Sequence, residues 1–240
     1  MKKEFAALMI LAGLLTVPAN CSANESVIIT GDWALPPFTE CVNGVMGGSS
    51  INGVKEVLGN SGIAAIPVCS GLWPETLKAL EAGKVDVVAT MFPGIDRGEY
   101  CDLFVSGEID EIGVFLASDN NLSINRTEDL FGAGVFATTE GDSWGKRINE
   151  LIKNGKIKVI LVPTLRDACN KTMDGNATGV LWSLTSGRLK IRDYNLSQNF
   201  RETRALEKQI YCVGISKNSP HLKELSDALF KNGYRRWVPE

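Results

Sequence analysis

The chain has little of what metal and thiol chemistry require. Its one histidine is His221, and none of its six cysteines stands in a CxxC arrangement, so zinc or haem ligation has little support. The sequence contains no GxSxG, HExxH or phosphate-loop motif, and the SxxK match from Ser143 to Lys146 lacks the companion motifs of serine–lysine hydrolases. We therefore predict no metal, no cofactor and no catalytic residue.

A block of basic residues is also absent. The 25 lysines and arginines are scattered among 28 acidic residues, which gives a formal net charge of -3, so the sequence does not favour a nucleic-acid partner. Hydrophobic residues make up 44% and charged residues 22%. These ordinary globular values argue against disorder.

Beyond the first two dozen residues, no segment of the sequence has an apolar run as long as a membrane span requires. The start reads MKK, then FAALMILAGLL, then ANCSA, a succession typical of a secretory signal peptide. We predict that residues 1–23 are cleaved after Ala23, which places the mature protein in the periplasm or outside the cell. A lipoprotein acylated on Cys21 is the alternative.

Export makes the cysteines candidates for disulfides. Loss of Cys21 leaves an odd number, five. We predict a bond between Cys41 and Cys69, because the first two strands should be neighbours and both cysteines lie near their carboxyl ends.

One pattern of strand, helix, strand, helix and strand occurs twice. Helices between strands that are apolar on both faces indicate parallel β-α-β units with right-handed crossovers. We therefore predict an α/β fold of two doubly wound lobes with a cleft between them. The first copy has strands at 27–30, 63–69 and 85–90, with helices from about Ser49 (capped by Ser49 or Ser50) and from Trp73 to Gly83. The second has strands at 133–138, 156–162 and 177–183, a helix with Trp144, Ile148, Leu151 and Ile152 on one stripe, and a helix at 165–174.

The remaining segments predict a two-strand hinge. Residues 102–118 link the two copies, residues 206–216 run back, and two extended crossings of this kind form a hinge. A last helix begins with Ser219 as cap and Pro220 in its first turn, and the tail YRRWVP should pack on the first lobe. The expected division is a signal peptide at 1–23, lobe 1 at 24–110 plus 207–240, and lobe 2 at 111–206.

Several segments, in order, resemble the solute-binding proteins of ABC importers, of the polar amino-acid type (bacterial extracellular solute-binding protein family 3). They are DWALPPF, LKALEAGKVDVVATM, the arginine of GIDR, CDLFVSG, LFGAGVFATTEG and IYCVGISKNSP. The resemblance covers essentially the whole mature chain and implies a periplasmic-binding-protein type II clamp. Such a clamp closes on a small solute and delivers it to an ABC-type membrane permease; we expect it to be a monomer.

The resemblance also implies which residues of lobe 1 bind the solute. Arg97 would grip a solute carboxylate, for which a guanidinium is well shaped, whereas the alternative is a surface arginine paired with Asp96 or Glu99. Thr90 keeps a hydroxyl that the family commonly has after its third strand. Asp32 and Trp33 belong to DWALPPF, where Leu35 replaces the family's stacking aromatic. Trp33 could take over the stacking or lie on the lobe surface, and Trp73 fits the core better than the site.

In lobe 2, the segment from Thr138 to Ser143 precedes a helix. Its backbone amides could bind an anion, and Thr139 and Glu140 are candidate site residues. Glu140 and Asp142 would oppose a second anion and favour an ammonium group instead. The alternative for this segment is N-capping by Asp142 or Ser143. Ser183 stands where the family usually has an aspartate for the solute's amino group, and a hydroxyl cannot neutralise an ammonium. We therefore expect a carboxylate-bearing solute that need not be a standard α-amino acid.

Two other functions share this fold. Exported cyclohexadienyl (prephenate/arogenate) dehydratases need a general acid, and Glu140 and Asp142 are candidates whose spacing does not single them out. A ligand-sensing protein would share the site and differ in its docking partner. We expect a non-enzymatic solute-binding protein, with these two functions as alternatives.

Overall fold

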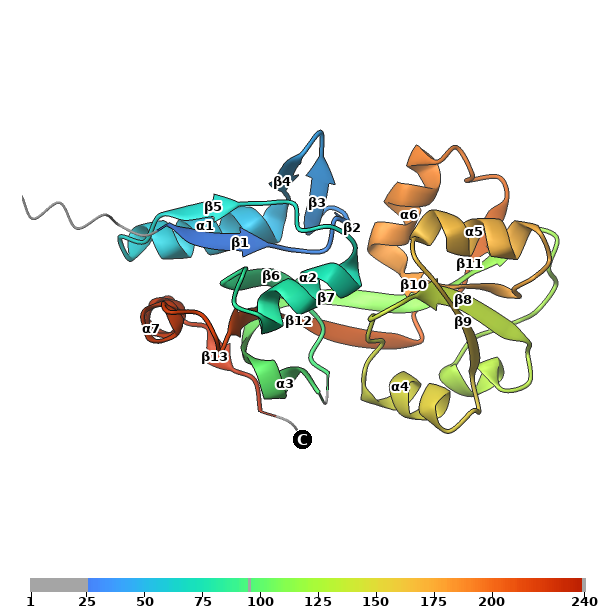
Figure 1. Cartoon of the computed structure of the whole chain (residues 1–240). Helices are drawn as coiled ribbons and strands as arrows, with labels where there is room; N and C mark the ends of the chain where they lie inside the picture. Colours follow the sequence, from blue (N-terminus) through green and yellow to red (C-terminus); the bar gives the residue numbers. More distant parts are fainter. Residues whose placement is uncertain (1–25, 95, 239–240) are drawn as a thin grey trace, which may run out of the picture.

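A single mixed sheet of ten strands runs through the molecule (Figure 1). The computed structural model describes residues 26–94 and 96–238. Along the sheet the strands follow the order β5-β1-β6-β12-β7-β10-β8-β9, with β11 and β13 also paired to β7, and β2, β3 and β4 form a second, small sheet. We keep the boundary proposed from the sequence, so lobe 1 denotes residues 26–110 and 207–238, and lobe 2 denotes residues 111–206.

The bounds of the elements are as follows. Lobe 1 contains β1 (Val27–Thr30), β2 (Ala34–Leu35), β3 (Thr39–Val42), β4 (Val45–Gly47), α1 (Ser49–Asn60), β5 (Ala65–Pro67), α2 (Trp73–Glu81), β6 (Val87–Met91), α3 (Arg97–Tyr100), β12 (Glu207–Ser216), α7 (Leu222–Lys231) and β13 (Arg235–Arg236). Lobe 2 contains η1 (Thr127–Leu130), β8 (Val135–Thr139), α4 (Lys146–Lys153), β9 (Lys158–Val162), α5 (Leu165–Met173), β10 (Gly179–Ser183), α6 (Leu184–Asp193) and β11 (Phe200–Glu202). Strand β7 (Cys101–Ala117) enters both lobes.

The predicted α/β fold is confirmed. Strand β1 pairs in parallel with β5 and β6, and β8 pairs in parallel with β9 and β10. The long strands β7 and β12 pair antiparallel from one lobe into the other, from Glu207 opposite Ile112 to Ser216 opposite Cys101. These are the two extended crossings that the sequence predicts, and they place the carboxyl ends of the parallel strands between the lobes (Figure 1).

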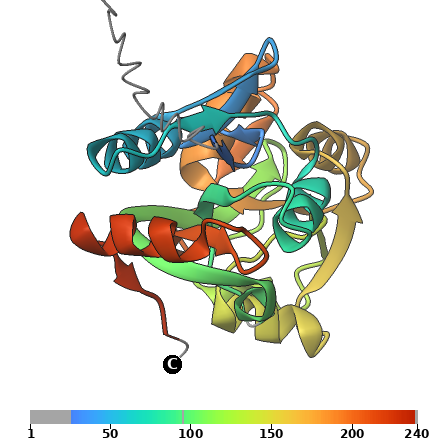
Figure 2. The ribbon, with the colours of Figure 1, turned by 60° about the vertical axis from the view of Figure 1, so that its left-hand side comes forward.

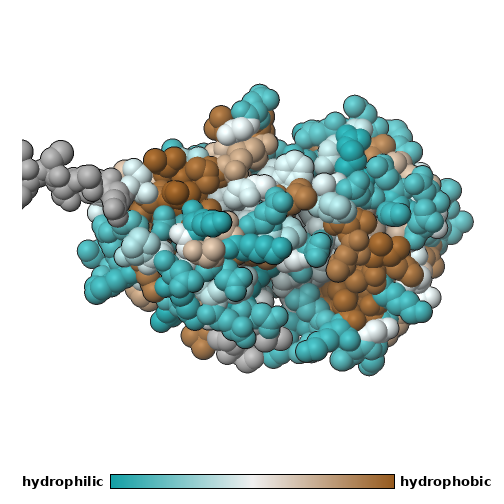
Figure 3. Space-filling view, viewed as in Figure 1, coloured by the Kyte–Doolittle hydropathy of each residue, from teal (hydrophilic) through white to brown (hydrophobic). Residues whose placement is uncertain are grey.

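Helices cover the sheet and bury its apolar residues. Figure 2 shows α7 alongside the sheet of lobe 1, and α1 and α7 pack on each other through buried faces that include Leu58 and Leu225. The tail packs on lobe 1 as predicted, because β13 pairs with β7 at Val105 and Phe104. Figure 3 shows apolar surface over the two edge strands, where Ile66 of β5 and Leu161 of β9 are exposed.

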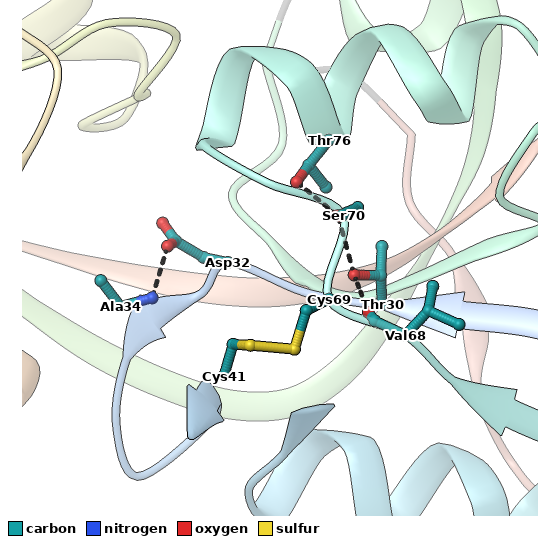
Figure 4. Close-up of a disulfide and its surroundings, with 8 residues drawn as sticks. All are labelled: Thr30, Asp32, Ala34, Cys41, Val68, Cys69, Ser70 and Thr76. Carbon is teal, nitrogen blue, oxygen red and sulfur yellow. Dashed lines mark hydrogen bonds between the residues drawn. A yellow bond between two sulfur atoms is a disulfide. The ribbon is translucent and has the colours of Figure 1, made fainter. Parts of the chain in front are cut away.

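The predicted disulfide is confirmed. Cys41 and Cys69 are bonded, with their Cα atoms 5.8 Å apart (Figure 4). Cys41 belongs to β3, which forms a hairpin with β4 in the small sheet. The disulfide therefore links this hairpin to the segment after β5. Cys101, Cys169 and Cys212 are buried free thiols. The predicted signal peptide and Cys21 lie outside the described residues.

Three predicted helix N-termini are wrong in a detail, although α1 begins at Ser49 as predicted. Helix α1 has Gly48 as its N-cap with no side-chain cap, because the hydroxyls of Ser49 and Ser50 donate to Glu108 of β7 instead. Helix α7 starts later than predicted, with His221 as N-cap. Ser219 accepts from the His221 backbone N–H and donates to Asp86.

The third wrong start is that of α4. It begins at Lys146 after Gly145, so neither Asp142 nor Ser143 caps it, and Trp144 precedes it instead of lying on its stripe. Asn149 orders this start, accepting a hydrogen bond from the Trp144 backbone and donating one to the Ser143 hydroxyl. Helix α6 and the small sheet were not predicted.

Candidate functional site

Polar side chains stand at the ends of parallel strands in both lobes. Thr90 lies in β6 and Asp32 follows β1, whereas Thr139 ends β8 and Ser183 ends β10. All four residues are buried. Because ligands of α/β sheets bind beyond the carboxyl ends of the strands, the fold brings these residues to the region where a solute would lie.

Arg97 crosses from lobe 1 to lobe 2. It begins α3, is only 6% exposed, and donates from Nη2 to the carbonyl oxygen of Gly141 at 3.1 Å. Its Nη1 is buried and has no hydrogen-bond partner among the described residues. Within those residues, neither Asp96 nor Glu99 forms an ion pair with it. Arg97 is therefore an inter-lobe residue with one donor group to spare, and not a surface arginine.

Trp73 reaches the same carbonyl. Its indole Nε1 donates to the Gly141 oxygen at 3.0 Å, and the Arg97 guanidinium lies over its ring, 5.2 Å from the centroid. Sequence reasoning assigned Trp73 to the core, and it is buried. The apolar stripe of α2 explains the burial, but the polar end of the indole faces lobe 2.

Two acidic side chains from opposite lobes lie near Arg97. Asp32 accepts from the Ala34 backbone N–H at 2.9 Å and points away from the disulfide (Figure 4). Burial raises the pKa of Asp32 to about 6, against the effects of that hydrogen bond, Lys190 and Arg97. Burial, and then the charge of Asp32, raise the pKa of Asp142 well above its usual range, while Arg97 opposes the rise.

Asp142 was considered from the sequence as a helix cap, as a general acid and, with Glu140, as a carboxylate that favours an ammonium group. Its Oδ2 is buried without a partner among the described residues, although the residue as a whole is half-buried. Burial lowers the pKa of Arg97, and Tyr100 and then Asp142 act against this effect. The cluster formed by Asp32, Arg97 and Asp142 therefore holds two carboxyl groups and one guanidinium.

Further buried polar atoms at or near the ends of β6, β8 and β10 have no hydrogen-bond partner among the described residues. Desolvated polar groups are costly unless they are hydrogen-bonded, so each of these atoms is a candidate contact for a polar molecule. In lobe 1 the set includes Thr90 Oγ1 and Arg97 Nη1, and in lobe 2 it includes Thr138 Oγ1, Thr139 Oγ1, Asp142 Oδ2, Trp182 Nε1 and Ser186 Oγ.

The other predicted residues are placed differently. Trp33 is 37% exposed in the turn after Asp32, and Glu140 is exposed. Ser183 is buried, but its hydroxyl already accepts from the Ser186 backbone N–H as the N-cap of α6. The structure thus groups Asp32, Thr90, Arg97 and Thr139 as buried strand-end residues, and it leaves Trp33 and Glu140 at the solvent.

Two polar contacts support the region from behind. Lys190 of α6 forms an ion pair with Glu40 of β3 at 2.7 Å, which joins lobe 2 to the disulfide-bonded β3–β4 hairpin of lobe 1. In the hinge, Tyr211 donates to the buried carboxylate of Asp110 at 2.6 Å, and its ring stacks on Phe92. The first contact joins the two lobes, whereas the second lies within lobe 1, beside the point where β7 and β12 cross into lobe 2.

A cavity of about 350 Å³ opens beside Arg97. Residues of both lobes line it, including Leu77, Tyr100, Gly141, Asp142 and Asn149. Its volume lies in the range of small-molecule sites. Within the described ranges, no group of three or more His, Cys, Asp or Glu side chains is placed to hold a metal ion. None of the helices described has the length and apolarity to cross a bilayer.

Comparisons with solved structures establish the fold. The chain is similar to a histidine kinase sensor domain that resembles periplasmic binding proteins, with a TM-score of 0.73, 22% identity, and coverage of 87% of this chain and 92% of that one. It is similar to holo ArgBP from T. maritima, with a TM-score of 0.71, 18% identity, and coverage of 88% and 91%. It is also similar to the BvgS periplasmic VFT2 domain of Bordetella pertussis, with a TM-score of 0.72, 15% identity, and coverage of 88% of this chain and 89% of that one. No family model and no curated protein matches the sequence.

Proposed function

We propose that this protein is an extracytoplasmic clamp that closes on a small carboxylate-bearing solute, for import by an ABC-type permease. The observation that carries this proposal is Arg97: it is buried and contacts lobe 2, and its Nη1 has no hydrogen-bond partner in the part of the chain that the structure describes. A guanidinium that is desolvated but incompletely bonded is well suited to a carboxylate, with which it forms short, charge-assisted hydrogen bonds. The hinge would lie where β7 and β12 cross near residues 110 and 207.

The remaining site residues would surround the solute. The hydroxyls of Thr90 and Thr139 come from opposite lobes and have no hydrogen-bond partner within residues 26–94 and 96–238, so both would be available to a solute held between them. Trp33 would stand at the mouth, and Glu140 would act through its charge at the solvent. Ser183, whose hydroxyl accepts one hydrogen bond as a cap, would contribute its O–H donor and its second lone pair.

The charges favour a solute that also carries a cationic group. Ser183 cannot neutralise an ammonium, but Asp32 and Asp142 supply two carboxyl groups beside the single guanidinium of Arg97. With both carboxyl groups ionised, the three side chains carry one net negative charge, which a solute with one carboxylate and two basic groups would balance. With Asp142 protonated, one basic group suffices. One of the similar structures is a holo arginine-binding protein, so cationic amino acids belong in the first screen.

A thermal-shift screen tests the proposal, because a solute that binds the folded state raises the unfolding midpoint by mass action. The panel should hold cationic, neutral and acidic amino acids, amines without a carboxylate, and organic acids. For the best solute, we expect Arg97→Ala to weaken binding by about 2–4 kcal/mol, roughly 30- to 1,000-fold. Arg126→Ala is the matched control, since Arg126 is exposed on lobe 2. Equal affinity of wild type and Arg97→Ala in calorimetry would remove Arg97 from the site.

Sensing is the second candidate function, favoured by the likeness to a histidine kinase sensor domain and to a BvgS domain. Solute binding to the purified chain does not separate it from import. Uptake of the labelled solute by cells with and without this protein does: import predicts a loss of uptake. Sensing predicts unchanged uptake and a lost response to the solute.

A dehydratase is the third candidate, favoured by one observation. Burial raises the pKa of Asp32 to about 6, which would keep part of this carboxyl protonated near neutral pH, as a general acid requires. Incubation with prephenate and ultraviolet detection of product tests it. Product formation that is lost in Asp32→Asn would favour the enzyme over the binding protein.

A further inference from the structure

The carbonyl oxygen of Gly141 accepts two hydrogen bonds from the opposite lobe. One comes from Trp73 Nε1 at 3.0 Å and the other from Arg97 Nη2 at 3.1 Å. The two donors also touch each other, because the guanidinium lies over the indole ring, 5.2 Å from its centroid. Cation–π attraction of this kind strengthens as the pair loses water, and both side chains are buried.

The backbone of lobe 2 is shaped for this contact at Gly141. Its φ of +81° lies in the left-handed region that residues with a Cβ rarely adopt. A Cβ at this position would also lie 3.3 Å from Trp73 Cδ1. Glycine therefore serves two needs here: it turns the carbonyl towards lobe 1 and lets the indole approach.

We propose that Trp73 is a positioning residue that holds Arg97 and latches lobe 1 to the Gly141 carbonyl of lobe 2. The indole face fixes the plane of the guanidinium, and the indole N–H shares the acceptor that fixes Nη2. Nη1 is then held in one direction, and none of the described residues gives it a hydrogen-bond partner. The solute-binding role of Nη1 rests on the proposed function, but the latch itself needs no solute.

Scattering and chemical protection of the solute-free, full-length protein test the latch. Trp73→Phe keeps a ring under the guanidinium and removes the N–H, so it should raise the ratio of open to closed clamp roughly fivefold, as expected for one lost hydrogen bond. Small-angle X-ray scattering should show a larger radius of gyration. Phenylglyoxal, which modifies arginine, should label Arg97 several-fold faster, as mapped by mass spectrometry.

Two further variants sharpen the test. Trp73→Leu also removes the ring and should open the clamp more than Trp73→Phe. Trp144→Phe makes the same change at a buried tryptophan of lobe 2 that packs on Trp182, and it should change neither readout. Should Trp73→Leu fail to fold, Trp73→Phe, which is closer in volume, carries the test alone.

The latch is overturned if Trp73→Phe leaves both the scattering curve and Arg97 labelling as in the wild type. It is also overturned if the solute-free wild type already scatters as an open clamp. A failed solute screen together with an opening Trp73→Phe variant would sink the proposed function and uphold the latch. A successful screen with an inert Trp73→Phe variant would do the reverse.

Discussion

The two lobes share one strand plan and divide the chemistry between them. Lobe 1 runs β5-β1-β6-β12 and lobe 2 runs β9-β8-β10-β7, each with three parallel strands and one antiparallel crossing strand. Lobe 1 brings the donors Arg97 and Trp73, whereas lobe 2 brings the acceptor carbonyl of Gly141. A repeated scaffold can therefore place strand ends symmetrically while the residues on them complement each other.

The lobes also differ in how they are held together. Lobe 1 carries the Cys41–Cys69 disulfide in its β3–β4 hairpin, whereas lobe 2 contains one cysteine, Cys169, a buried thiol. The large apolar cluster of lobe 2 in turn takes in Phe38, Phe92 and Tyr211 of lobe 1. Lobe 2 and the hinge thus share one apolar core, whereas lobe 1 has smaller apolar clusters and a disulfide.

The largest expected effect on stability comes from removing the Cys41–Cys69 disulfide. The disulfide spans a sequence separation of 28 residues, so its loss in a Cys41→Ser, Cys69→Ser double variant should cost about 3.5 kcal/mol through the entropy of the unfolded chain. Urea unfolding with and without reductant measures the difference. Hydrogen exchange should show the loss of protection in lobe 1, and the Cys169→Ser variant of lobe 2 should not respond to reductant differently from the wild type. An equal loss of protection in both lobes would contradict the assigned difference.

Acidic residues form an exception to the division of roles, because each lobe contributes one. The pKa of Asp32 is raised from 3.8 to about 6, so its contribution to stability is fully present below pH 4 and is lost as the pH rises through 6. At pH 8 the buried, ionised carboxylate should cost up to about 3 kcal/mol relative to a neutral isostere. Asp32→Asn should therefore raise the unfolding midpoint at pH 8 and leave it nearly unchanged at pH 4.

Unfolding midpoints at pH 4 and pH 8 also compare the buried acidic residues of the two lobes. Asp142→Asn should change stability in the same direction, since burial and Asp32 both raise the pKa of Asp142. Because the two carboxyl groups interact, the double variant should gain less than the sum of the single variants. Asp129, which is partly exposed and whose pKa is lowered by hydrogen bonds from Asn125 and Arg126, provides a control of opposite sign. Additive gains would show that Asp32 and Asp142 titrate independently.

The sequence predicted most of the scaffold because periodicity records burial. The parallel strands and α1, α2 and α5 lie close to their predicted positions. Helix α6 was missed because it follows β10 without a loop, Ser183 both ending the strand and capping the helix. The hairpin was missed although Asn43-Gly44, with φ values of 52° and 78°, is a strong signal for a two-residue hairpin turn.

The candidate site was harder to predict, because it depends on which segments of two lobes meet. Arg97 was proposed through a family resemblance, and its contact with Gly141 involves residues 44 positions apart. Trp73 satisfies the apolar stripe of α2, so its pattern carried no sign of the indole N–H bond. Asp142 was adjacent to a predicted helix start and was weighed mainly as a cap. Only the folded chain shows that Asp142 and Asp32 approach each other.

The smallest predicted effect concerns how each lobe starts a helix. Helix α5 of lobe 2 is capped by Thr164, whose Oγ1 accepts from the Asp167 backbone N–H at 3.1 Å, whereas α1 of lobe 1 starts after Gly48 with no side-chain cap. Thr164→Ala should cost about 1 kcal/mol. Ser49→Ala should cost only a few tenths, because its exposed hydroxyl bonds Glu108 and not the helix end. Urea unfolding of the two variants side by side measures this, and equal losses would mean that Ser49 caps α1 in solution.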